Sequence, residues 1–268
     1  KIVYKIPGIS AEDFPAVSEI GEMEYIEIPC RVLRGVLEKT FFAVSQDEMR
    51  PNLNGVFFQV LGQNLEVVAT DGHRLSLVNT IFSENNQNTL TGVIIPRKGV
   101  SEIRKLVDDG DSVGVGVVDG VFVVKKNDMT LRTSLINSEY PNYRQVIPEE
   151  GGVIVNLDKG KVLHSLRRMS VMSTEKFSGV KIQLYDNRML LTSTNPDVGE
   201  ARDEIDISYN GEVLEVGYSV RYLIDAMEPV DGDVVSFEMR TGDGPGIVRS
   251  AENDNYICVV MPIKLRKD

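Results

Sequence analysis

Hydrophobic positions along the chain follow two periods, and helical spacing is confined to a few short segments. Residues 30–45, 96–108, 155–172 and 219–229 each repeat apolar side chains at the interval that forms one helix face. Pro29 precedes the first segment, and Asn156 or Asp158 can cap the third. The spacing therefore predicts four amphipathic helices, each with one face packed on the rest of the protein.

Most of the remaining sequence consists of short apolar or alternating stretches that are typical of strands. They are GVFFQV, LEVVAT, RLSLV, VGVGVV, VFVVKK and MTLRT in the first half, and VKIQLY, MLLTST, EVLEVG, VVSFEM and YICVVM in the second. Turn pairs such as Asp71-Gly72 and Asn127-Asp128 separate them. Helices packed on antiparallel strands define the α+β fold class.

One module occurs twice in the chain. The stretch LNGVFFQVLGQNLEVVATDGHRLSLVNT at 53–80 aligns with FSGVKIQLYDNRMLLTSTNPDVGEARD at 177–203. The spacing between the two aligned stretches is far longer than one unit of a solenoid repeat, so it indicates a duplicated domain. A Pro-rich linker, YPNYRQVIPEEGG at 140–152, separates the copies. We expect two domains, at residues 1–147 and 148–268, each with two helices on antiparallel sheets.

The copies diverge after a shared Thr-Asp or Thr-Asn pair. Thr70-Asp71 aligns with Thr194-Asn195, but only the first copy continues with Gly72-His73-Arg74-Leu75. On composition alone, ATDGHRLSLV is a strand, a turn and a strand. Divergence between copies of one scaffold also marks the place where a binding site can be added.

Composition places few limits on function. The chain is 42% hydrophobic and 26% charged, has no apolar run near the roughly 20 residues that span a bilayer, and contains no stretch that resembles a signal peptide. Its two cysteines, Cys30 and Cys258, lie in apolar contexts, which favours a reduced, cytoplasmic location. The sequence starts at Lys1 on a strand-like stretch, so we expect a fragment or a processed chain.

Charge is segregated by element. A net charge of −11 argues against nucleic acid, but the first three predicted helices carry more basic than acidic residues. This contrast favours a phosphate-facing surface, with solvated helix faces as the alternative. The basic residues concerned are Arg31, Arg34, Lys39, Arg97, Lys98, Arg104, Lys105, Lys159, Lys161, Arg167 and Arg168.

No residue pattern supports catalysis. The two histidines, His73 and His164, belong to no zinc, nucleophile or nucleotide motif. GDGPG at 242–246 lies between strands, which favours a hairpin loop over a phosphate loop. Asp71 and His73 could be drawn as an acid/base pair, but no nucleophile is near in sequence. We expect no enzyme, no cofactor and no metal.

Several longer stretches together resemble the bacterial β sliding clamp, the processivity subunit of DNA polymerase III. They are RPNLNGV (50–56), ATDGHRLSLV (69–78), VIIPRKGVSEI (93–103), YPNYRQVIP (140–148), EKFSGV (175–180) and VVMPIKL (259–265). SAEDFP at 10–15 resembles the entry to the middle domain of that family. The resemblance covers the middle and C-terminal domains, so the family's N-terminal domain is not part of this sequence.

The resemblance implies a DNA-clamp fold and a function without chemistry. In the family, two subunits of three domains form a homodimeric ring whose helices line the hole and face double-stranded DNA. Contacts to backbone phosphate without base readout hold the clamp while letting it slide. The head-to-tail subunit interface maps near Val171 and Met172. Without the first domain, we expect this polypeptide to be mainly monomeric and not to close a ring.

The family also binds short linear motifs from the replicative polymerase, clamp-loader subunits and repair polymerases. They enter a pocket between the last two domains, where an apolar groove for Leu and Phe anchors and a flexible methionine suit several partners. Carried over by motif, the pocket comprises Leu53, Thr70, Gly72, His73, Arg74, Leu75, Pro141, Val146, Phe177, Tyr222, Val259, Val260, Met261, Pro262 and Ile263.

The sequence departs from the family at two places near this pocket. Position 145 is Gln where some members have Arg, and Arg266-Lys267-Asp268 follows Leu265 where many members end. Both departures can shift peptide preference. A protein-interaction module without DNA encirclement, and a hydrolase using Asp71 and His73, remain the competing functions.

Overall fold

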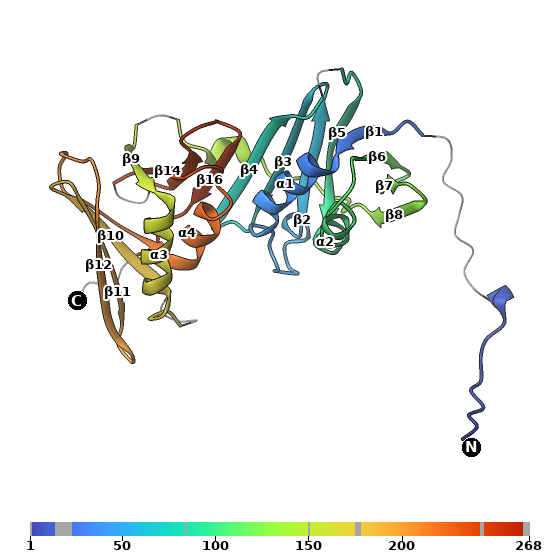
Figure 1. The fold of residues 1–268 in the computed structure, drawn as a ribbon, viewed down its shortest axis with the longest axis horizontal. Helices are drawn as coiled ribbons and strands as arrows, with labels where there is room; N and C mark the ends of the chain where they lie inside the picture. The colour runs from blue at the N-terminus through green and yellow to red at the C-terminus, as the bar shows by residue number, and fades with distance from the viewer. Residues whose placement is uncertain are drawn as a thin grey trace.

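The fold of the chain is given by a computed structural model, which describes residues 2–13, 23–83, 85–149, 151–174, 178–241 and 244–264. Two units lie side by side, and residues 2–13, with a short 3-10 turn at Ala11–Asp13, extend away from the first unit (Figure 1). In the described part of the chain, no helix is both long and apolar enough to cross a membrane.

The element order confirms the duplication. The first unit contains β1 (Ile26–Pro29), α1 (Cys30–Phe41), η2 (Pro51–Leu53), β2 (Gly55–Leu61), β3 (Asn64–Thr70), β4 (Arg74–Ile81), β5 (Thr89–Pro96), α2 (Arg97–Leu106), β6 (Ser112–Val118), β7 (Val121–Lys126) and β8 (Met129–Ser134). After η3 (Tyr143–Val146), the second unit contains β9 (Val153–Asp158), α3 (Lys159–Ser170), β10 (Gly179–Tyr185), β11 (Arg188–Asn195), β12 (Gly199–Asp206), β13 (Leu214–Ser219), α4 (Val220–Met227), β14 (Val234–Met239), β15 (Gly246–Ser250) and β16 (Tyr256–Val260). Apart from short 3-10 turns, both units follow the order strand, helix, four strands, helix, three strands.

One sheet runs through both units, and we call it the shared sheet. Within the described residues its strand order is β5-β2-β3-β4-β16-β15-β14-β9. The units meet where β4 pairs antiparallel with β16, from Val78 opposite Tyr256 to Arg74 opposite Val260. We call this junction the seam. Each unit keeps a second sheet of its own, ordered β1-β6-β7-β8 in the first unit and β12-β11-β10-β13 in the second.

The predicted helices are found, and two boundaries are clearly wrong, one of which is the end of α1 at Phe41 instead of 45. Helices α1, α2 and α4 lie inside their predicted segments. Helix α3 begins at Lys159 instead of 155, because Val153–Asp158 pairs with β14 and alternates buried and exposed side chains as a strand does. Asp158 is the N-cap, as expected, and its carboxylate accepts a hydrogen bond from the Lys161 N–H at 2.9 Å.

The shared sheet has two differently covered faces near the seam. Side chains such as Ala69, Val78 and Val260 point to the face where α1 and α4 pack, and they belong to the main core. We call it the helix face. On the opposite face, the linker face, a smaller apolar cluster packs against the linker. It consists of Val68, Leu75, Leu77 and Val259, covered in part by Phe57, Tyr140, Tyr143, Ile147 and Ile257.

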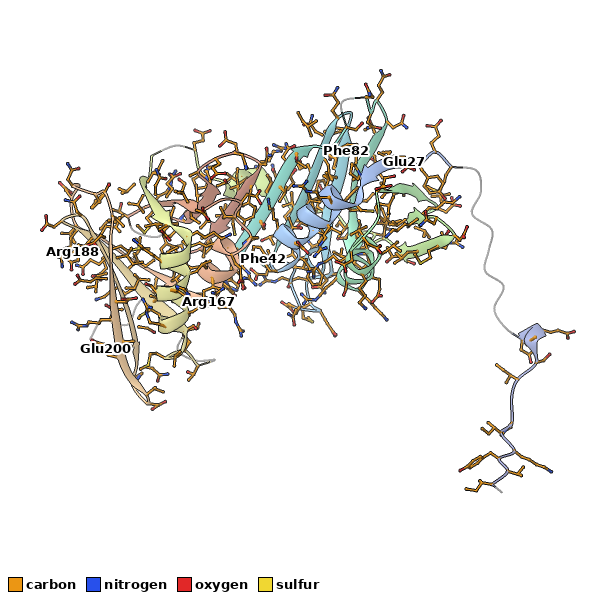
Figure 2. The ribbon with its side chains drawn as sticks, viewed as in Figure 1. Glu27, Phe42, Phe82, Arg167, Arg188 and Glu200 are labelled. Carbon is orange, nitrogen blue, oxygen red and sulfur yellow. The ribbon has the colours of Figure 1, made fainter. Side chains whose placement is uncertain are left out.

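Within the described residues, the duplication also makes two edge strands equivalent to the two strands of the seam. Strand β12 holds the place in the second unit that β4 holds in the first, and β8 corresponds to β16. Strand β12 (GEARDEID) is rich in charged side chains, which is typical of an edge strand kept from random pairing. It lies on the far side of the second unit from the seam, where Figure 2 labels Glu200 on this strand and Arg188 on the adjacent strand β11.

Candidate functional site

The turn that joins β3 to β4 places His73 at the surface beside the seam. Thr70 Oγ1 donates to the Arg74 carbonyl at 2.7 Å and accepts from the Gly72 N–H at 3.1 Å. Asp71 Oδ1 accepts from the N–H groups of His73 and Arg74 at 2.9 and 3.0 Å. Gly72 has a φ of +88°, which a residue with a Cβ rarely adopts. The Asp71 carboxylate thus stabilises the turn. This stretch is a strand, a turn and a strand, as its composition predicts.

The segment after β16 crosses from this turn to the second unit. The Met261 N–H donates to the His73 carbonyl at 2.9 Å, and the Ile263 N–H donates to the Gly217 carbonyl at 2.8 Å. A Cβ on Gly179 would lie 2.9 Å from Ile263 Cδ1, so Gly179 makes room for that side chain. Met261 and Ile263 remain 39% and 37% exposed. Met261 is therefore presented beside His73, and Ile263 lies against Gly179 and Gly217 of the second unit.

Arg74 lies under the same surface and connects both units. Its guanidinium contacts Asp225 at 2.5 Å, Asp71 at 3.1 Å and the Phe42 carbonyl at 2.6 Å. It also stacks over the rings of Tyr222, at 4.4 Å from the ring centre, and Phe42, at 5.2 Å. Burial lowers the pKa of Arg74, but hydrogen bonding and the charges of Asp225 and Asp71 outweigh it and raise the pKa overall. Arg74 is thus held charged at the seam.

His73 and Tyr222 bring the two units together at the surface. Their rings stack with centroids 6.5 Å apart and planes 25° apart. Tyr222 lies in the first turn of α4, whose N-cap is Ser219. Because Arg74 packs against the Tyr222 ring, its ion pairs with Asp71 and Asp225 fix the position of this aromatic side chain.

The structure distributes the predicted pocket residues over three environments. Leu53, Thr70, Leu75 and Val259 are buried, the last three on or next to the linker face. Arg74, Tyr222 and Pro262 are half-buried, and the exposed ones are Gly72, His73, Pro141, Val146, Met261 and Ile263.

One predicted pocket residue points away from this surface, and a second cannot be placed because it lies outside the described residues. Val260 points to the helix face and is fully buried in the main core, because it alternates with Val259 along β16. Its side chain supports the sheet and is not available to a ligand. Phe177 lies outside the described residues.

Sequence reasoning missed the residues that hold this surface in place. Asp225 lies far from Arg74 in the chain, and Phe42 offers Arg74 a carbonyl and a ring from the end of α1. Phe42 could have been found through the duplication. It follows α1 as Val171 follows the equivalent helix α3, and the resemblance places Val171 at an interface. No sequence pattern indicated Asp225.

Only part of the basic helix surface is free of carboxylates. Ion pairs occupy Arg34 (with Glu38 and Asp108), Lys39 (with Asp231), Lys105 (with Glu102), Arg167 (with Glu228) and Arg168 (with Asp203). Within the described residues, the basic side chains of these helices that make no ion pair are Arg31, Arg97, Lys98, Arg104, Lys159 and Lys161. Arg97 and Arg104 both stack on the Phe41 ring, each 4.8 Å from its centre.

The end of α3 presents a free surface that corresponds to the seam. Val171 is 78% exposed, and the Met172 carbonyl accepts a hydrogen bond from Asn195 Nδ2 at 2.8 Å. In the first unit, Phe42 follows α1 and contacts Arg74 across the seam. Val171 therefore holds the position in the second unit that Phe42 holds in the first.

Two copies of one α+β unit, joined edge to edge through a shared sheet, define the DNA-clamp class of protein. Residues 27–142 match the family "DNA polymerase III beta subunit, central domain", and residues 144–264 match "DNA polymerase III beta subunit, C-terminal domain". The beta sliding clamp of Pseudomonas aeruginosa is 32% identical over 98% of this chain and 71% of the relative. The chain belongs to the β sliding clamp family of DNA polymerase III.

Solved structures agree with this assignment. The crystal structure of the Pseudomonas aeruginosa DNA polymerase III β subunit is 31% identical and superposes with a TM-score of 0.89, over 96% of this chain and 70% of that chain. A second structure of a clamp from that organism, bound to griselimycin, has a TM-score of 0.88 at 32% identity over the same shares of the two chains. The clamp of Bacillus subtilis, at 24% identity and a TM-score of 0.90, shares the fold.

Proposed function

We propose that this chain acts as part of a DNA sliding clamp that tethers a replicative polymerase and other partners to double-stranded DNA, without enzymatic activity. The observation that carries the proposal is the seam. Units join by pairing β4 with the strand equivalent to β8, and in the part of the chain that the structure describes both β12 and β8 are edge strands of the same kinds. Further units can therefore add at both ends in the same way, as a ring requires, with Val171 and Met172 near one of the added seams.

DNA contact is assigned to the helices. Phosphate contacts without base readout suit a protein that moves along DNA, and the acidic remainder of the chain repels DNA from other surfaces. The test is fluorescence anisotropy of a labelled duplex over a range of salt concentrations. Binding should weaken steeply with salt and be insensitive to base sequence. Salt-independent binding, or none at low salt, would favour the alternative of an interaction module without DNA encirclement.

The surface around His73, Tyr222, Met261 and Ile263 is proposed as the site for partner peptides. It combines exposed apolar side chains with the exposed His73 ring, which suits motifs with Leu and Phe anchors. The relative bound to griselimycin supports a ligand-binding surface in this family. Clamp-loader and polymerase motifs are the proposed ligands, in the cytoplasm.

Peptide binding has a direct test in this chain. A synthetic peptide with Gln followed by Leu and Phe anchors should bind with micromolar affinity, about −8 kcal/mol. Isothermal titration calorimetry measures this affinity. Replacing the Phe anchor of the peptide by Ala should weaken binding most, because buried aromatics dominate such sites. Equal binding of both peptides would contradict the proposed site.

A further inference from the structure

Two buried carboxylates on the linker face of the shared sheet receive the linker. Glu66 on β3 is 5% exposed and Glu238 on β14 is 7% exposed, although glutamate is rarely buried. Glu66 accepts from Arg144 Nη2 at 3.0 and 2.8 Å and from the Tyr143 hydroxyl. Glu238 accepts from the Gly152 N–H at 3.0 Å and from Arg240 at 2.6 Å. The start and the end of the linker are thus each fixed to the sheet by one glutamate.

Apolar contacts surround the Glu66 contact. Tyr140 and Tyr143 pack on the Phe57 ring with centroids 5.2 and 5.7 Å away, and the Tyr140 hydroxyl donates to the Val68 carbonyl at 3.3 Å. Gly92 makes room for Phe57, because a Cβ there would lie 2.2 Å from its ring. Burial and the Glu66 carboxylate raise the pKa of Tyr143 to about 12, so its hydroxyl stays a donor at neutral pH.

The fixed segment reaches the proposed peptide site. Tyr143 and Ile147 pack in the same cluster as Leu75 and Val259. Val146, between them in η3, is 50% exposed. Since Tyr143 and Ile147 are both anchored, the position of the intervening Val146 depends on the Glu66 contacts.

We infer that Glu66 is a positioning residue for partner-peptide binding: through Tyr143 and Arg144 it holds linker residues 140–147 against the linker face and so presents Val146 and Pro141 to the peptide. The inference rests on the proposed peptide site. It adds a residue that touches no peptide but determines where one wall of the site lies.

The experiment measures peptide affinity by calorimetry in the parent, Glu66→Gln and Arg144→Ala. Glu66→Gln loses the charge that Arg144 and Tyr143 donate to, and we expect about three- to tenfold weaker binding. The Arg144 side chain is 65% exposed, so the chain should fold without it. Arg144→Ala should weaken peptide binding in the same direction as Glu66→Gln, but less. In a double-mutant cycle the two effects should not add.

Glu238→Gln is the matched control, because it changes an equally buried glutamate that is also paired with an arginine on the same face. It should lower the melting temperature but leave peptide affinity unchanged. Hydrogen exchange of residues 141–147 should speed up in Glu66→Gln and stay at the parent rate in the control Glu238→Gln. Parent-like affinity of Glu66→Gln, or equal weakening by Glu238→Gln, would overturn the inference while leaving the peptide site intact. A parent that binds no peptide would overturn both.

Discussion

At the scale of single residues, Met261 separates peptide contact from folding. Its side chain is 39% exposed while its backbone N–H holds the His73 carbonyl. Met261→Ala keeps that hydrogen bond and removes only a flexible apolar contact, so it should weaken peptide binding about tenfold with little change in stability. Calorimetry and a thermal melt measure the two effects.

Met129 on β8 provides the matched control. It is 54% exposed and belongs to a different sheet edge. Met129→Ala should leave peptide affinity at the parent value. Comparable losses in both variants would mean that the peptide does not bind beside His73. Leu75→Asp is a harsher change, because it buries an unpaired carboxylate and should lower both affinity and stability.

Cys258 predicts how stability depends on alkaline pH. Burial raises the pKa of its thiol from 9.0 to about 12. The unfolded chain therefore loses this proton first, and its contribution to stability is complete below pH 9 and lost as the pH rises toward 12. For this one group the loss is about 1.4 kcal/mol per pH unit. Urea unfolding of the parent and Cys258→Ala between these limits should show a shallower decline in the variant.

At the scale of elements, the helices differ in how much of their charge is available to DNA. Arg31, Lys98 and Lys161 are exposed and make no ion pair within the described residues, whereas Arg34 and Arg167 are held by carboxylates. An ion-paired side chain must leave its partner to meet a phosphate. Lys98→Ala should therefore reduce the slope of log affinity against log salt by about 0.9, as expected for one lost phosphate contact. Arg167→Ala should reduce it less.

The measurement is anisotropy of a labelled duplex in both variants and the parent. Equal slopes for Lys98→Ala and Arg167→Ala would show that intramolecular pairing does not select the phosphate contacts. Peptide affinity serves as the internal control, since neither residue is among those proposed for the peptide site, and it should stay at the parent value.

The sequence predicted the elements whose side chains alternate or repeat cleanly. The prediction that the third helix starts at residue 155 was wrong. Val155 and Leu157 fit either a strand or a helix face, and only pairing with β14 decides between the two. Strand β12 was not expected as a strand, because GEARDEID has almost no apolar residues. It forms because β11 offers a partner along its whole length, from Arg188 opposite Asp206 to Asn195 opposite Gly199.

The candidate site was only partly open to prediction. The turn around His73 follows from its own residues, since Thr70, Asp71 and Gly72 make local hydrogen bonds. Its contacts with Asp225 and Tyr222 depend on how the second unit meets the first, which no local pattern encodes. Val260 was assigned to the pocket through the resemblance, although the pleat of β16 turns its side chain to the core.

At the scale of the whole molecule, the shared sheet predicts that the two units unfold together. The main core contains buried residues from both units, and the seam joins their backbones. Calorimetry should show one transition with equal calorimetric and van't Hoff enthalpies. Asp225→Ala removes the carboxylate 2.5 Å from the half-buried Arg74 and should cost about 2 kcal/mol. Hydrogen exchange in β7 and in β11 should report this loss equally, whereas a loss confined to β11 would contradict a joint unfolding unit.

The seam also determines how the protein responds to force. Contacts on both faces of the sheet resist bending at the seam. On the helix face they are the ion pairs Lys39–Asp231 and Arg74–Asp225, and on the linker face they are the packed side chains of Tyr143 and Ile147. A pull that separates the units in the plane of the sheet acts across β4 and β16 and loads their paired residues at the same time. Such a joint is stiff at small displacement and brittle at its limit. A ring built from these joints would open by complete rupture of one seam, with the other seams keeping their shape.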